Sequence, residues 1–176
     1  MRIFKRLAPV LAAAVTLALS SCAGNKGILV KTPDLNVPFE AQIKIQAGEL
    51  EMNGNLKRYG TGIWAMNAES PETLAGLELS YGDEGVKAKL GELALDIPAE
   101  NINDGAVFAQ IFKAVDSAAA AEELYCSDTE DGKVFSGEFA GKAYSITFDP
   151  ETLAPVRIEI PGAEICGEFE NFRIMT

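Results

Sequence analysis

The sequence predicts an α+β fold, in which an antiparallel meander of short strands is interrupted once by an amphipathic helix. Apolar and polar residues alternate with a period of two along much of the chain from residue 39, which is typical of half-buried strands. The period changes to that of a helix only once, after residue 104. Turn-forming residues separate the alternating runs at short intervals, which favours strands joined in series.

The first 21 residues are typical of a secretory signal. Three basic residues lie before an apolar stretch at 7–19 that is too short to remain as a membrane-spanning helix. Leu19-Ser20-Ser21-Cys22 resembles the lipobox of bacterial lipoproteins, in which the cysteine is joined to diacylglycerol and the peptide before it is removed. The resemblance implies a palmitate-type anchor on Cys22 and an extracytoplasmic place in the bacterial cell envelope, attached to the bilayer. The alternative is an ordinary cleaved signal, in which Cys22 has no such role.

The net charge of the chain indicates which classes of partner it does not bind. The 176 residues carry a formal net charge of −11, which becomes −14 when the three basic residues of the signal are removed. A field of this sign repels phosphate backbones and anionic headgroups. We therefore expect no nucleic-acid partner, and we expect membrane contact to come from the anchor.

After the signal, residues 22–37 are predicted to be a lipid-anchored tether, because they contain glycine and proline and show little periodicity. The folded domain is expected to span residues 38–176. Residues 39–46 alternate strictly and form the first predicted strand. Further strands are predicted at about 49–58, 61–68, 75–81 and 86–96.

The predicted helix begins at Asp104, a suitable N-terminal cap, and runs for four or five turns. Its apolar stripe consists of Val107, Phe108, Ile111, Phe112, Val115 and Ala119. Alternation resumes after an acidic turn at 127–132 and predicts strands around 144–148 and 156–160. A last run at 165–174 has irregular spacing and is predicted to contain either a bulge or the end of a strand.

Two groups of residues resemble the superfamily of periplasmic lipoprotein carriers and outer-membrane lipoprotein receptors. The first is Gly54-Asn55-Leu56-Lys57-Arg58-Tyr59 with Trp64 and Pro71, and the second is 148–158 with the closing 169–172. The resemblance implies a strongly curved antiparallel sheet, an unclosed β-barrel, whose concave face is covered by helix and encloses an apolar cavity for acyl chains. It places the carriers' functional arginine on Arg58. The proline that follows this arginine in the family is absent here, and a soluble carrier would not have its own anchor.

Cys126 and Cys166 form an even pair in an exported protein and are candidates for a disulfide. Such a bridge would stabilise the fold by roughly 4 kcal/mol on the loop-entropy model. The other interpretation is two buried thiols.

Catalytic and metal-binding patterns are few. The chain contains no histidine, which excludes Ser-His-Asp and Cys-His catalysis, and two cysteines without histidine do not make the usual zinc sets. The acidic cluster at 128–132 lacks the spacing of a calcium loop. We expect no enzyme activity, no metal and no cofactor.

Two functions remain open. The first is a lipid-binding module that holds an acyl chain or another hydrophobic ligand in the half-barrel. The candidate ligand-binding residues are Arg58, Trp64, Met66, Phe108, Ile111, Phe112, Tyr144, Ile146 and Phe148. The same apolar residues can equally fill a dry core. The second function is a non-enzymatic interaction module that docks a cell-envelope protein or enzyme.

Overall fold

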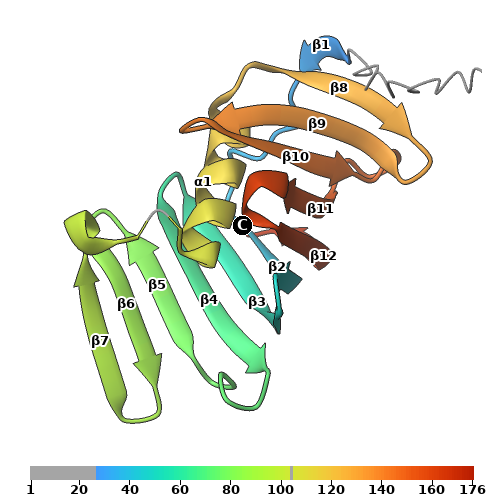
Figure 1. The fold of residues 1–176 in the computed structure, drawn as a ribbon. Coiled ribbons are helices and arrows are strands. Elements are labelled where there is room, and N and C mark those ends of the chain that lie inside the picture. The colour runs from blue at the N-terminus through green and yellow to red at the C-terminus, as the bar shows by residue number, and fades with distance from the viewer. Residues whose placement is uncertain (1–26, 104) are drawn as a thin grey trace, which may run out of the picture.

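The computed structural model describes residues 27–103 and 105–176, which form one curved antiparallel sheet with a single α-helix among the described residues (Figure 1). The predicted fold class is confirmed: the sheet is open and curled, and the helix lies on its concave side. Residues 1–26, on which the predicted signal peptide and Cys22 fall, and Asp104 lie outside the described residues.

Twelve strands make up the sheet, in the order β1-β8-β9-β10-β11-β12-β2-β3-β4-β5-β6-β7. Their bounds are β1 Ile28–Lys31, β2 Phe39–Ala47, β3 Leu50–Gly60, β4 Ile63–Ser70, β5 Glu78–Gly82, β6 Gly85–Leu90, β7 Leu93–Pro98, β8 Glu123–Thr129, β9 Gly132–Phe139, β10 Lys142–Phe148, β11 Pro155–Ile160 and β12 Ile165–Ile174. Two meanders, β2 to β7 and β8 to β12, are joined where β12 pairs with β2. The free edges are β1 and β7.

The helix α1, Val107–Ala120, lies across the sheet because of this topology. β7 and β8 follow one another along the chain but lie near opposite ends of the sheet. The connection between them must therefore cross the concave side, and it carries α1 and the short 3-10 helix η1, Ala99–Asn101, with it. A second 3-10 helix, η2, Pro161–Ala163, joins β11 to β12.

The core lies between α1 and the sheet. Alternate residues of the strands point to it, as in β2, where Phe39, Ala41, Ile43 and Ile45 are buried and the residues between them are not. From the helix come Ile111, Phe112, Ala114, Val115 and Ala118. Register shifts in β3, β10 and β12 are bulges that let the sheet bend around this core. The last strand contains a bulge between Glu170 and Arg173, which is one of the two features predicted there.

Three expectations from the sequence are corrected. The single strand expected at 86–96 is a hairpin, because Gly91 takes a positive φ of 59° and turns the chain between β6 and β7. Residues 28–37, expected to be part of the tether, belong to the domain, since β1 pairs with β8 and Leu35 is buried. The helix is preceded by Ala106, which makes no side-chain capping hydrogen bond.

Within the described residues, no helix has both the length and the apolar character needed to cross a membrane. No cluster of three or more potential metal-ligating side chains occurs in that part of the chain either.

Candidate functional site

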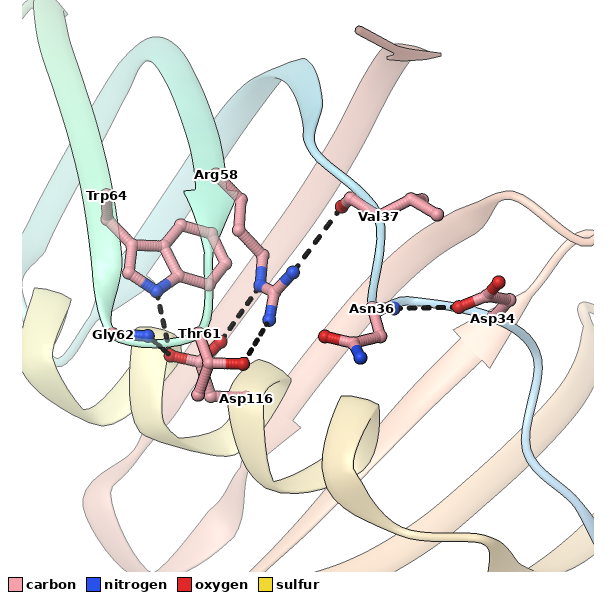
Figure 2. A network of polar contacts seen from close by, with 8 residues as sticks. All are labelled: Asp34, Asn36, Val37, Arg58, Thr61, Gly62, Trp64 and Asp116. Carbon is pink, nitrogen blue, oxygen red and sulfur yellow. Dashed lines mark hydrogen bonds and ion pairs between the residues drawn. The ribbon is translucent and has the colours of Figure 1, made fainter. Parts of the chain in front are cut away.

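A buried ion pair fastens α1 to the sheet (Figure 2). Arg58 on β3 is fully buried, and its Nε donates to Oδ1 of Asp116 on the helix at 2.9 Å. The remaining guanidinium nitrogens donate to the Val37 carbonyl at 3.4 Å and to the Thr61 hydroxyl at 3.2 Å. Each nitrogen of the buried cation therefore has an acceptor, which a buried charge requires.

The Asp116 carboxylate is shared between α1 and the turn that joins β3 to β4. Its Oδ2 accepts hydrogen bonds from the Gly62 amide and from Trp64 Nε1, both at 2.9 Å (Figure 2). Asp116 was missed by the sequence analysis. Its position four residues after Phe112 puts it on the buried stripe of the helix, and a carboxylate there is the signal that was available.

Aromatic side chains fill the space beside this ion pair. Trp64 stacks on Phe112, with ring centroids 4.7 Å apart and planes 5° from parallel. Tyr81 meets Phe112 edge-on at 5.6 Å, and Phe108 lies 6.4 Å from it. The stacked pair is enclosed, whereas Tyr81 and Phe108 are half-buried and lie where the covered core ends.

All nine residues proposed from the sequence as ligand-binding lie in or against this one core. Arg58, Trp64, Met66, Ile111, Phe112, Tyr144, Ile146 and Phe148 are buried, and Phe108 is half-buried. The residues that the sequence analysis grouped are therefore close to one another in the structure. Their binding role stays a prediction, since these side chains contact one another and the helix.

Beyond the helix, the apolar inner side of the sheet continues without cover. Two ladders of directly paired residues cross it: Trp64, Tyr81, Val86 and Ile97 form one, and Met66, Leu79, Ala88 and Leu95 form the other. Trp64 and Met66 at the start of the ladders are buried, the residues on β5 and β6 and Ile97 are half-buried, and Leu95 on the last strand is 58% exposed. We call the members on β5, β6 and β7 the β5–β7 face.

The β5–β7 face was not identified as a site from the sequence. Alternation in residues 86–96 predicts apolar residues there, and one helix is too little to cover the concave face of so many strands, but the sequence does not show which strands are left uncovered. In Figure 1, β6 and β7 extend past α1. The face is about as wide as three strands, or roughly 14 Å at 4.8 Å per strand.

A hollow of about 800 Å³ lies on the opposite, convex side, over β12, β2, β3 and β4. Its lining includes Gln42, Asn55, Lys57 and Arg173. Polar side chains of this kind do not suit an acyl chain.

The predicted bridge between Cys126 and Cys166 is wrong, and both thiols are free. Three strands separate β8 from β12, so the cysteines are about 19 Å apart along the sheet, far beyond the reach of a disulfide. They also point to opposite sides, since Cys126 pairs with the buried Phe135 and Cys166 lies beside Glu159. Burial raises the pKa of both thiols.

The chain is similar in fold to several solved structures. An uncharacterised conserved protein from Thermus thermophilus is 13% identical, with a TM-score of 0.51 and 81% of each chain covered. A LolA superfamily protein from Nitrosomonas europaea is 9% identical, with a TM-score of 0.42, covering 81% of this chain and 88% of that one. A putative outer membrane lipoprotein-sorting protein domain from Vibrio parahaemolyticus is 9% identical, with a TM-score of 0.36, covering 80% and 86%.

At these identities the likeness is one of fold. The open, curved antiparallel sheet that the sequence resemblance implied agrees with the fold observed here. No protein-family model matches the chain, and no curated protein matches it.

Proposed function

We propose that this protein is a lipid-anchored extracytoplasmic lipoprotein that binds an acyl chain or another hydrophobic ligand on the concave side of its sheet. The site is the β5–β7 face, with its member Tyr81 and the helix residue Phe108 at the inner margin. Cys22 is the proposed point of attachment to the bilayer.

The uncovered ladders carry this proposal. An apolar surface that continues from a buried tryptophan to a free edge exposes hydrophobic area that a monomeric soluble domain normally covers. An extended apolar ligand laid along the ladders would be dehydrated on one side by Leu79 and Leu95, and its inner end would meet Phe108, which lies beside Phe112. Each buried CH₂ group would contribute about 0.8 kcal/mol.

Ligand access to this face needs no movement of the helix. By contrast, a ligand between Trp64 and Phe112 would have to separate a stacked pair and displace the segment held by the Asp116 network. The β5–β7 face is therefore the first site to test.

A fluorescent fatty acid tests the proposal. Binding of cis-parinaric acid to the Cys22→Ser chain should be saturable, and Leu95→Asn should weaken it about tenfold, since the substitution removes roughly two CH₂ groups of buried contact. The matched control is Leu153→Asn, which replaces a leucine of similar exposure in the β10–β11 turn, at a positive φ that asparagine accepts. The control should bind the probe like the parent chain.

Two results would overturn or move the proposed site, and a third would show that the core itself holds no ligand. If the parent chain binds no probe, the lipid-binding proposal fails. If Leu95→Asn binds normally and Phe112→Ala does not, the ligand occupies the core residues proposed from the sequence. If Phe112→Ala lowers the free energy of unfolding by about 3 to 5 kcal/mol and leaves probe binding unchanged, the core is dry and filled.

The free edge of β7 favours a second function, that of an interaction module for a cell-envelope protein. β7 pairs with β6 only, and its other side presents backbone groups that a partner strand can pair with. Leu93, Leu95 and Ile97 would extend the contact on the inner face. Two results together would support this function. The parent chain would bind no fatty acid but would pull down an envelope protein, and the Ala94→Pro chain would no longer pull it down, because proline removes a backbone donor from the edge strand.

A further inference from the structure

We propose that the other free edge of the sheet, at β1 and β8, rests on the membrane surface, through an edge patch of Ile28, Leu29 and Tyr125. The inference rests on the proposed anchoring at Cys22 and adds an orientation of the domain on the bilayer. The occupant we assign to the patch is the interfacial zone of a lipid bilayer.

The β1–β8 edge carries several large apolar side chains that are exposed to solvent. Ile28 is 73% exposed, Leu29 is 53% and Tyr125 is 62%, so three large apolar side chains are accessible within two short strands. Leu29 and Tyr125 are directly paired across β1 and β8, so their side chains lie next to each other on one face. That face is the outer one, because Leu124 and Cys126 on either side of Tyr125 are buried.

Ile28 extends the patch around the rim of the sheet. It pairs with Cys126 and therefore points to the inner side, but at the edge it has no neighbouring strand to cover it. The edge thus presents apolar side chains on both sides of a strand with unpaired backbone groups. At an interface, headgroups and water can satisfy those backbone groups, while the side chains enter the boundary zone.

The distance to Cys22 is short. Five residues lie between Cys22 and Ile28, and a fully extended chain spans at most about 3.6 Å per residue, so the six steps place β1 within roughly 22 Å of the proposed acylation site. The expectation that 22–37 is a long tether allowed the domain to stand away from the bilayer. Because residues 28–37 belong to the domain, that freedom is lost.

Gly27, the first described residue, packs closely against β8. A Cβ atom there would overlap the backbone carbonyl of Cys126, so the backbone passes directly against β8. Gly27 therefore lies at the same edge that carries the patch. The opposite edge, β7, lies at the far end of the sheet (Figure 1).

Local charge is compatible with this contact although the whole chain is acidic. β1 contains no acidic residue, and Lys31 lies directly opposite Glu123 in the strand register. Asp128 at the other end of β8 forms an ion pair with Lys133 at 2.9 Å. A tyrosine flanked by aliphatic side chains is typical of the membrane–water interface.

Hydrogen–deuterium exchange on vesicles tests the orientation. The acylated protein in phosphatidylcholine vesicles should show at least threefold slower amide exchange in 28–31 and 123–127 than the Cys22→Ser chain mixed with the same vesicles. The double variant Leu29→Thr, Tyr125→Thr should lose this slowing while remaining anchored. The matched control is Tyr59→Thr, Ile63→Thr, whose side chains are 52% and 48% exposed on β3 and β4, and it should keep the slowing.

Mass spectrometry of the same samples separates the two proposals. Diacylglycerol on Cys22 together with unchanged exchange at the edge would overturn the orientation and leave the anchor in place, and slowing confined to β7 would overturn it as well. An unacylated Cys22 would overturn both the anchor and the orientation. Fatty-acid binding is measured on the Cys22→Ser chain and is independent of all these results.

Discussion

At the scale of single residues, Arg58 and Asp116 are the most constrained polar groups of the core. The guanidinium is fully buried, and the carboxylate accepts from Arg58, Gly62 and Trp64 at once. Burying a charge costs free energy that only well-placed partners offset. Removing one member of the ion pair therefore leaves the other as an uncompensated charge, which destabilises the fold.

We expect Asp116→Ala to lower the free energy of unfolding by about 3 to 5 kcal/mol, because it leaves the Arg58 cation buried without its anion. Urea unfolding of the parent and variant chains measures the difference. Arg157→Gln is the control, since its ion pairs with Glu159 and Glu168 are exposed and should contribute at most about 1 kcal/mol. Equal losses in the two variants would show that the buried pair has no special role.

A second feature at the scale of single residues is the separation of Cys126 from Cys166. They lie on opposite faces of the sheet with three strands between them. Non-reducing peptide mapping of protein purified without reductant should find no peptide linking Cys126 to Cys166. Finding that linked peptide in folded, monomeric protein would contradict the observed strand order.

At the scale of elements, the turn between β10 and β11 is organised by one carboxylate. Asp149 Oδ1 accepts from the Thr152 amide at 2.7 Å, from the Thr152 hydroxyl at 2.9 Å and from the Glu151 amide at 3.0 Å. These hydrogen bonds, first those from Thr152, lower the pKa of Asp149 below its ordinary value of 3.8. The lowered pKa means that this carboxylate stabilises the fold above pH 3.8, and that the contribution is lost as the pH falls through the folded-state pKa.

We expect Thr152→Val to raise the pKa of Asp149 towards its ordinary value, because the hydroxyl donor is lost and the amide donors remain. NMR titration of the Asp149 carboxyl carbon measures it. Glu151→Gln provides the control, since it keeps the backbone donor and should leave the pKa of Asp149 much closer to that of the parent. An unchanged titration in Thr152→Val would show that the amides alone set the pKa.

At the scale of the whole molecule, the sheet has two uncovered ends with different surroundings. The β1–β8 edge is adjacent to Gly27, where the described residues begin, whereas β7 lies at the other end of the sheet. Leu93 is 75% exposed and Leu95 is 58% exposed, and they lie on a strand with a free side. Exposed apolar edge strands promote pairing between molecules.

We expect the Cys22→Ser chain to self-associate with rising concentration through β7, and Leu95→Lys to keep it monomeric, because a charge on an edge strand opposes pairing. Sedimentation velocity over a range of concentrations measures both. Leu153→Lys, at an exposed leucine away from the edge, is the control. Identical association in all three chains would exclude the β7 edge as its cause.

Local periodicity was enough to predict much of the fold. Alternation in 39–46 and 144–148 located β2 and β10, and the apolar stripe from Val107 located α1, because both patterns arise from the geometry of a single element. β1 was missed because a four-residue edge strand has no alternation long enough to recognise. The β6–β7 hairpin was missed because apolar residues continue on both sides of Gly91.

By itself, the sequence determined the fold class, the position of the helix along the chain and the set of residues that meet in the core. Only the tertiary structure decided which of those residues are covered, that Asp116 pairs with Arg58, and that Cys126 and Cys166 cannot meet. The physical reason is strand order. The position of a strand in the sheet depends on pairings between residues far apart in the chain, such as β12 with β2, and these pairings place α1 over the middle of the sheet and leave β7 and β1 at its open ends.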